Sequence, residues 1–260
     1  MNHLRAVYTI WYRDILRFWH DKMRMVSSIV FPLLFLFIFG SGLSRSIGSI
    51  SPGVDFIQFM FPGIIGMTVL MSSFMSGISV VWDREFGFLK EVLVAPISRA
   101  SVAIGKTLGS ATIALLQGMI ILLLAPVVGA SISLATVLAL LPLMLLLAIA
   151  MGSLGVLLAT RIKSIQAFQA VMQMFMFPMI FLSGVFFPVD GLPAWMSVLV
   201  KVNPATYGIA PIRQVILGAD SPFGISVLGH TMSLWDNVAV MAVFATVMTL
   251  LAVWSFGSQD

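Results

Sequence analysis

The sequence predicts an all-α integral membrane protein with six transmembrane helices. The chain is 60% hydrophobic and only 9% charged, whereas a soluble domain carries about 25% charged residues. It also contains six apolar runs without any Asp, Glu, Lys, Arg or His, each long enough to cross a hydrocarbon core about 30 Å thick. The runs cover residues 25–43, 56–82, 107–128, 134–159, 165–187 and 237–256. They predict one transmembrane domain over residues 1–260, with a six-span bundle at 25–256.

The positions of the basic residues predict the orientation of these spans. Of the 14 Lys and Arg residues, eleven precede the first run or lie between the second and third or the fourth and fifth runs. Only three lie in the remaining segments. Because Lys and Arg accumulate in cytoplasmic loops, both termini should be cytoplasmic. The net charge of +4 therefore reflects membrane topology, and we expect no nucleic-acid partner.

The polar residues of the chain do not form a recognisable active site. The chain has no Cys and its three histidines are scattered, so neither a disulfide nor a metal site is expected. Gly105-Lys106-Thr107 resembles the end of a phosphate-binding loop, but Ala100 stands where that loop requires glycine. We therefore expect no enzyme and no cofactor in this chain. Because the runs lack an ionisable relay, energy for uphill transport should come from outside the bilayer.

Residues 3–22 have the pattern of an amphipathic helix. At about 100° per residue, seven apolar or aromatic residues fall in one sector, and basic residues lie opposite. The sector comprises Leu4, Tyr8, Trp11, Tyr12, Ile15, Phe18 and Trp19. Such a helix lies in the membrane interface with its aromatic side chains dipping inward. It serves either as a simple topology anchor or as an interface helix that also cradles a partner subunit.

The first four runs contain residues that shape helix packing. Pro32 should kink the first span, and Pro62 with Gly63 permits a bend or a close helix contact in the second. A short link at residues 129–131 should join the third and fourth spans as an antiparallel hairpin. The small residues Gly152 and Gly155 in the fourth span suit close packing against a neighbouring helix.

The loop after the second run contains another amphipathic segment. Phe86, Leu89, Val92 and Leu93 share one face of a short helix, which Pro96 should end. A short helix of this kind either inserts into a groove on another protein or lies on its own membrane.

The fifth run carries three glutamines. Gln166, Gln169 and Gln173 share one helix face because they are spaced by three and four residues. Met and Phe side chains surround them, including Phe177. The amides either bond across a helix interface or line a path for an amphiphilic substrate, with Met supplying an adaptable apolar wall.

The segment between the fifth and sixth runs, residues 188–236, should lie on the external side. It is too long for a simple turn, and its first half is not very polar. We expect two short helices, at 192–202 and 206–217, separated by Asn203-Pro204. Both are too short to span a bilayer, so they should be re-entrant or lie on the surface.

Two groups of residues resemble the type-2 ATP-binding-cassette (ABC) exporter permeases. The first group comprises Glu85, Gly87, Leu93, residues 95–99 and Gly105-Lys106. The second comprises residues 183–188, Leu192-Pro193, Trp195, Asn203-Pro204, Tyr207 and Arg213. The resemblance covers nearly the whole chain, including the number of spans and the loop lengths.

This resemblance implies the permease subunit of an ATP-driven exporter in the cytoplasmic membrane, surrounded by lipid. Such permeases pair as homodimers or heterodimers and bind two copies of a separate ATP-binding cassette subunit, which holds ATP and Mg. The segment 85–95 would be the coupling helix, with contacts from Glu85, Gly87, Leu89, Leu93, Pro96 and Arg99. The substrate path would follow the second and fifth spans past Gln166, Gln169, Gln173 and Phe177. We expect a hydrophobic or amphiphilic substrate, such as a drug, an antibiotic or a lipid-like molecule.

Two other functions suit a polytopic membrane protein. A stand-alone secondary transporter or channel would be expected to carry an intramembrane charge or a repeat between its halves, and the sequence shows neither. A membrane enzyme acting on lipids would need a polar catalytic cluster at the interface. Asp83, Arg84 and Glu85 come nearest to one, and we interpret them as solvated or docked charges.

Overall fold

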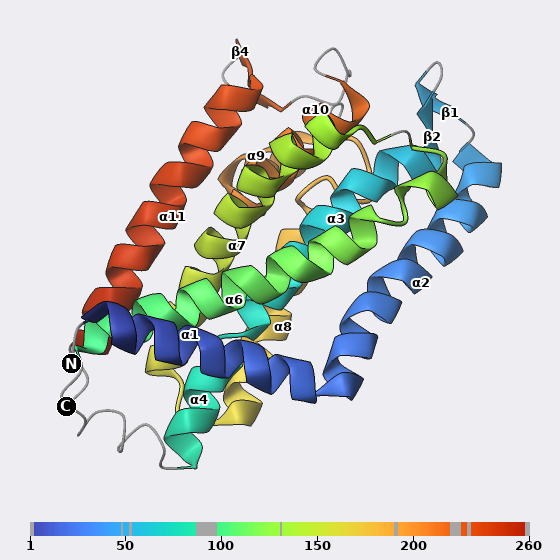
Figure 1. The fold of residues 1–260 in the computed structure, drawn as a ribbon. Coiled ribbons are helices and arrows are strands. Elements are labelled where there is room, and N and C mark those ends of the chain that lie inside the picture. Colours follow the sequence, from blue (N-terminus) through green and yellow to red (C-terminus); the bar gives the residue numbers. More distant parts are fainter. Residues whose placement is uncertain are drawn as a thin grey trace.

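Long apolar helices, joined by shorter ones, make up most of the structure (Figure 1). The computed structural model describes residues 3–47, 49–51, 54–86, 98–130, 132–189, 192–218, 225–227 and 230–257. In chain order the helices are α1 (His3–His20), α2 (Lys22–Ile47), α3 (Phe56–Met75), α4 (Ile78–Glu85), α6 (Arg99–Leu122), the 3-10 helix η1 (Ala125–Val128), α7 (Leu134–Arg161), α8 (Ile165–Phe181), α9 (Ala194–Val202), α10 (Pro204–Leu217) and α11 (Leu234–Gly257).

Two short antiparallel hairpins lie at one end of the bundle. β1 (Ser49–Ser51) pairs with β2 (Val54–Asp55), and β3 (Ser226–Val227) pairs with β4 (His230–Thr231). Figure 1 shows both hairpins at the end opposite α1, and α11 ending at the same end of the bundle as α1. We call these the hairpin end and the α1 end. The sequence did not predict these strands, since two or three residues are too few to show an alternating pattern.

Five segments of the described chain are long and apolar enough to cross a membrane: Met25–Gly42, Phe56–Glu85, Arg99–Leu122, Leu134–Arg161 and Leu234–Phe256. A further apolar helix, α8, has 17 residues and is shorter than the predicted run at 165–187. It ends at Phe181, three residues after Pro178, and the chain turns at Gly184 with a φ of 78°. The protein is therefore a multi-span, all-α membrane protein, and its sixth span stays a prediction.

The second predicted span is divided into α3 and α4 by a turn at Ser76 and Gly77. This turn packs directly on α7, because a Cβ atom added to Gly77 would lie 2.5 Å from the carbonyl oxygen of Gly155. A Cβ atom on Gly155 would in turn collide with the backbone of Phe74. The close packing predicted for Gly155 is thus confirmed, and it permits backbone contact between α3 and α7.

The helix α3 lies at the centre of the bundle. It contacts α2, α6, α7 and α10, and Phe59, Phe61 and Ile64 are fully buried. Because neighbours surround it, α3 is apolar on all sides instead of along a single stripe. Gly63 lets the loop after α8 approach closely, since a Cβ atom there would lie 3.0 Å from the Cα of Val185.

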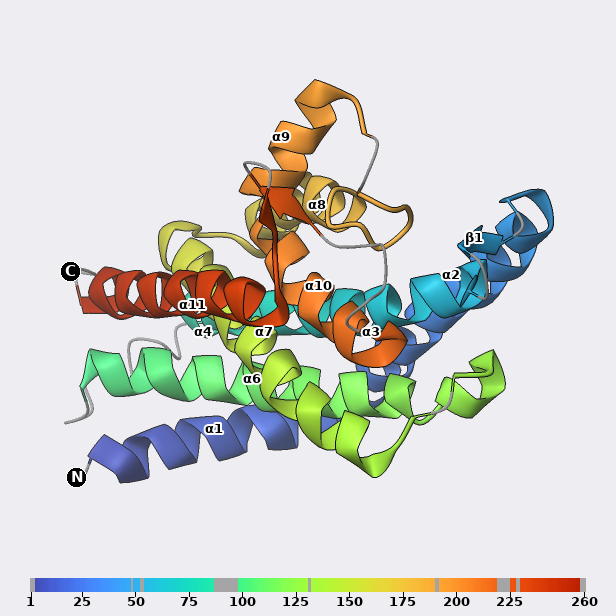
Figure 2. The same ribbon diagram turned by 90° about the horizontal axis from the view of Figure 1, so that it is seen from above.

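The amphipathic N-terminal segment forms α1, which runs alongside α6 (Figure 2). Its contact face consists of Ala6, Ile10, Asp14 and Phe18, whereas most of the predicted aromatic sector stays exposed. The exposed members include Leu4, Tyr8, Tyr12 and Trp19. The prediction that Phe18 belongs to the membrane-facing sector is wrong, since Phe18 is buried with the residues that face α6. The sequence could not show that α6 would cover this side of α1. A location of the exposed face in the membrane interface stays a prediction.

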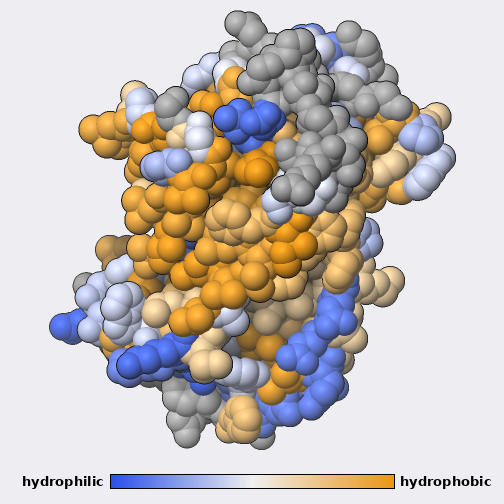
Figure 3. Space-filling model, turned by 90° about the vertical axis from the view of Figure 1, so that its right-hand side faces the viewer, coloured by the Kyte–Doolittle hydropathy of each residue, from blue (hydrophilic) through white to orange (hydrophobic). Residues whose placement is uncertain are grey.

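The helices are not packed equally closely. Figure 2 shows α8 and α9 standing to one side of the layer that contains α6, α7 and α11. Only Phe168, Met176 and Ile180 of α8 are buried. Figure 3 shows a broad hydrophobic surface across the middle of another face, with hydrophilic residues gathered mainly toward its ends. A surface of this kind suits contact with lipid.

Candidate functional site

A buried cluster of charges joins α1, α4 and α6 at the α1 end. Nζ of Lys106 donates to Oδ2 of Asp83 at 2.8 Å, to Oδ1 of Asp14 at 3.3 Å and to Oγ of Ser79 at 2.9 Å. Lys106 is 4% exposed and Asp83 is 5% exposed. The interpretation of Asp83 as a solvated or docked charge is therefore wrong, because its partners lie within the chain. We call Asp14, Asp83 and Lys106, with Arg13 and Arg17, the charge cluster.

Two arginines of α1 complete the charge cluster. Nη2 of Arg13 donates to Oδ2 of Asp83 at 2.8 Å, and Nη1 of Arg17 lies 3.5 Å from Oδ1 of the same carboxylate. Burial alone lowers the pKa of Arg13, but the neighbouring carboxylates of Asp83 and Asp14 outweigh it, so this pKa lies above its ordinary value. Arg13 and Arg17 thus hold α1 against α4 through Asp83.

The last two residues of α4 form hydrogen bonds with backbone groups at the junction between α7 and α8. The guanidinium of Arg84 donates to the carbonyl oxygens of Thr160 and Ile162, both at 2.9 Å, and to that of Ala159 at 3.4 Å. Oε2 of Glu85 accepts from the backbone N–H of Ile165 at 3.1 Å. Helix ends leave such carbonyl and N–H groups without intrahelical partners. Arg84 therefore caps the end of α7 and Glu85 caps the start of α8, and we call this pair the α4 clamp.

The residues predicted to contact an ATPase partner are only partly described. Glu85 belongs to the α4 clamp, and Arg99 is the half-exposed first residue of α6. Gly87, Leu89, Leu93 and Pro96 lie outside the described residues. The predicted coupling helix at 85–95 is therefore described only at its first two positions, and its role stays a prediction.

A cavity of about 90 Å³ lies between α2, α3 and α8, and we call it the apolar cavity. Phe35, Met67, Met176, Phe177 and Gln173 are among the side chains that line it. The structure thus brings Gln173 and Phe177 together at one cavity, next to the second predicted span. Gln166 and Gln169 lie nearer the N-terminal end of α8. They are exposed and are not among the described residues that line the apolar cavity.

Aromatic rings form a row along the apolar cavity. The ring of Phe35 lies 5.5 Å from that of Phe186, which lies 5.0 Å from Phe181, and Phe181 stacks on Phe177 at 5.8 Å. Phe177 is nevertheless 65% exposed. The row therefore connects α2 with α8 while leaving one face of α8 uncovered. The sequence gave no signal for it beyond the number of Phe residues in these runs.

Arg213 of α10 is a buried charge that the sequence placed in a short external helix. It is 3% exposed, its guanidinium carbon lies 4.3 Å from the ring centre of Phe59, and Nη2 donates to the carbonyl of Gly184. Burial lowers the pKa of Arg213 to about 10. The arginine thus fastens the turn after α8 to α3 and α10, so α10 is packed inside the bundle instead of lying on its surface.

Long apolar helices around an uncharged cavity, with an ionic network gathered at one end, are typical of a membrane transport protein. The sequence matches the ABC-2 type transporter family over residues 5–217. The chain belongs to this family, which confirms the resemblance carried by the two groups of residues described above. It is an ABC transporter permease, a transport component and not a catalytic one.

Named relatives agree with this assignment. The chain is 28% identical over 233 residues to ycf38 of Cyanophora paradoxa, named as a transport permease, covering 87% of this chain and 80% of the relative. It is 27% identical over 212 residues to nodulation protein J of Rhizobium leguminosarum bv. viciae, covering 80% and 81%. It is also 28% identical over 169 residues to YbhR of Escherichia coli (strain K12), named as a multidrug ABC transporter permease, covering 64% and 46%.

Proposed function

We propose that this chain is the membrane subunit of an ATP-driven exporter of a hydrophobic or amphiphilic molecule. It would have six spans with both termini cytoplasmic, would pair with a second permease, and would bind two copies of a separate ATP-binding cassette subunit that holds ATP and Mg. The relatives named as transport permeases support the transport role. The charge distribution supports the orientation, since basic residues concentrate at the α1 end.

The observation that carries this proposal is the link from Glu85 to α8. Glu85 begins the predicted coupling helix, and its carboxylate holds the first N–H of α8. The same helix contributes Gln173, Met176 and Phe177 to the apolar cavity. A force applied to the segment that follows α4 would therefore reach the cavity wall through one hydrogen bond and one helix. This gives a partner subunit a mechanical route to the substrate.

The loose packing of α8 supports a role for a second permease copy. Met174, Phe175 and Phe177 are exposed large apolar residues on a helix with few buried positions. Exposed apolar area of this kind marks an interaction surface. In a dimer with α8 at the interface, the exposed Gln166 and Gln169 would line the same path as Gln173.

The first experiment is affinity purification of the tagged chain from mild detergent, followed by identification of co-purifying proteins and an ATPase assay. We expect a stoichiometric ATP-binding cassette subunit, with ATPase activity that is lost on Leu89→Pro while membrane insertion is kept. Recovery of the chain without an ATPase would overturn the proposal. It would instead favour a stand-alone secondary transporter or channel.

A glutamine of α8 provides a test of the substrate path. Gln169→Leu should change which substrates are exported more than it changes stability, because an exposed amide contributes little to folding but supplies a polar contact on the proposed path. Transport of a panel of hydrophobic drugs by vesicles containing the complex measures this effect. An unchanged substrate profile combined with poor folding would show that Gln169 serves helix packing only.

A further inference from the structure

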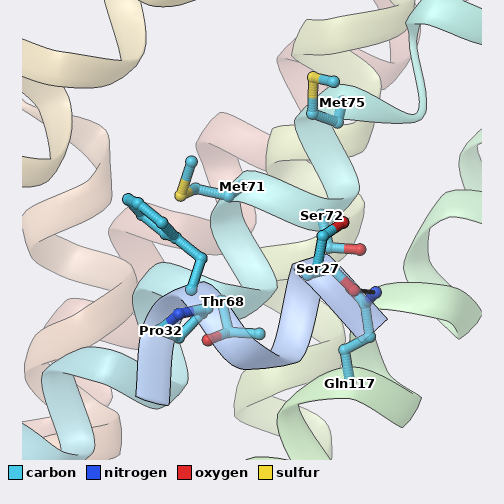
Figure 4. A pocket seen from close by; sticks show the side chains of 9 residues that line it. Ser27, Pro32, Thr68, Met71, Ser72, Met75 and Gln117 are labelled. Carbon is cyan, nitrogen blue, oxygen red and sulfur yellow. Dashed lines mark hydrogen bonds between the residues drawn. The ribbon is translucent and has the colours of Figure 1, made fainter. Parts of the chain in front are cut away.

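A second cavity, of about 230 Å³, lies between α2, α3 and α6. Figure 4 shows side chains from the three helices around it, and those with polar groups are Ser27, Ser28, Thr68, Ser72 and Gln117. We call it the polar cavity. One water molecule needs roughly 10–15 Å³ of such space. The polar cavity is therefore far larger than a site for a single structural water.

The amide of Gln117 is only half satisfied. Gln117 is 2% exposed, and its Nε2 donates to Oγ of Ser28. Its Oε1 is buried and has no hydrogen-bond partner among the described residues. A buried carbonyl without a donor is unfavourable, so the site would gain from any ligand that supplies one.

The hydroxyl groups around Gln117 also offer acceptors. Oγ1 of Thr68 donates its proton to the carbonyl of Ile64 at 2.8 Å, and Oγ of Ser28 donates to the carbonyl of Met25 at 2.9 Å. The single proton of each of these two hydroxyls is already donated, so they offer a ligand only oxygen lone pairs. Oε1 of Gln117 and the oxygens of Thr68 and Ser28 therefore suit a ligand that donates hydrogen bonds.

The polar cavity lies next to the apolar cavity. Phe31 of α2 and Met71 of α3 line both of them. Beyond these two residues the described lining of the apolar cavity is aliphatic, aromatic or Met, apart from Gln173. Acceptors therefore gather in one cavity and hydrocarbon side chains in its neighbour.

We propose that the polar cavity binds the head group of an uncharged amphiphile that carries hydroxyl or amide N–H donors. The hydrocarbon part of the ligand occupies the apolar cavity. The described residues lining the polar cavity are all uncharged, so a charged head group would be buried without a counter-ion. This inference rests on the proposed export of an amphiphile for its biological meaning, but binding tests it separately from transport.

The test uses the purified permease in nanodiscs of dioleoylphosphatidylcholine, a lipid without hydrogen-bond donors in its head group. The probe is monolauroylglycerol with a photoreactive diazirine at the end of its acyl chain, and the matched probe is its di-O-methyl ether. The ether keeps the tail and the oxygen atoms but has no donors. We expect saturable labelling of α3 and α8 by the glycerol probe, with affinity about tenfold higher than for the ether, because a missing donor leaves the buried acceptors unpaired.

Two substitutions locate the head group. Gln117→Met and Thr68→Val keep the size of the side chain but remove an acceptor, and each should weaken the glycerol probe about tenfold without changing the ether. Thr68→Val keeps the test decisive should Gln117→Met fold poorly. The matched control is Gln58→Met, which removes an amide from α3 outside both cavities and should leave both probes unchanged.

The outcomes separate this inference from the proposed function. Equal labelling by the two probes, or labelling that Gln117→Met and Thr68→Val leave unchanged, would overturn the proposed recognition of donors. If such a result accompanied a co-purifying ATPase, the exporter would stand and only this binding site would fall. Selective labelling of a chain that recruits no ATPase would establish the site and overturn the exporter.

Discussion

Lys106→Met is expected to destabilise the folded permease by about 3–5 kcal/mol, the usual cost of removing one partner of a buried ion pair. The methionine fills the same space, but Asp14 and Asp83 would lose the ammonium that both of them contact. Differential scanning fluorimetry of the purified protein in detergent measures the loss as a lower melting temperature. Because α1 and α4 meet at this lysine, transport should fall with it.

Two variants show whether charge balance explains this result. Lys163→Met removes an exposed lysine and should change the melting temperature little. Lys106→Met combined with Asp14→Asn should recover part of the loss, because it removes the carboxylate that has lost the ammonium, whereas Asp83 keeps Arg13 and Arg17 as partners. If the double variant is no more stable than Lys106→Met alone, the carboxylate of Asp14 is not what makes the lysine necessary.

Glu85→Lys should abolish most ATP-dependent transport while leaving the protein folded. The substitution removes the carboxylate that holds the first N–H of α8 and places a positive charge at the positive end of that helix. Glu85 is exposed, so the effect on stability should be small. We expect transport in proteoliposomes with the ATPase partner to fall roughly 5- to 150-fold, which corresponds to a coupling free energy of about 1–3 kcal/mol.

The matched control for this variant is Glu85→Gln. An amide oxygen accepts the same hydrogen bond without the charge, so most transport should remain. Unchanged transport in the Glu85→Lys variant would show that the contact between Glu85 and α8 is not needed for coupling to the ATPase. A parallel loss of melting temperature and transport would assign Glu85 a structural role alone.

The long helices could be predicted because their signal is local. Each of the five long segments overlaps a predicted apolar run, and the amphipathic pattern at 3–22 forms α1. The break at Ser76 and Gly77 left no mark on hydropathy, since it depends on contact with Gly155. The end of α8 was also missed, because the apolar sequence continues to Phe187 after the helix has stopped at Phe181.

The sites were predicted less completely, because they depend on distant partners. The sequence marked Gly105-Lys106 as part of a motif, but the partners of Lys106 come from residues 92 and 23 positions away. From the sequence, Arg213 is a charge in a short external helix. Only the structure shows its contacts with Phe59 and with the carbonyl of Gly184. A signal for Asp14 was available: it lies four residues after Ile10 and four before Phe18, on the buried face of α1.

The packing of α1 on α6 fixes how many residues may precede Lys106 in that helix. Gly105 admits Ile10 at the surface of α6, since a Cβ atom there would lie 2.9 Å from the Cβ of Ile10. The next residue, Lys106, must face the carboxylates. One inserted residue between Arg99 and Gly105 would turn the start of α6 by about 100° relative to Gly105 and Lys106. The buried Val102 and Ala103 would then leave their places in the core. Length variation among related permeases should therefore be rare within the first two turns of α6.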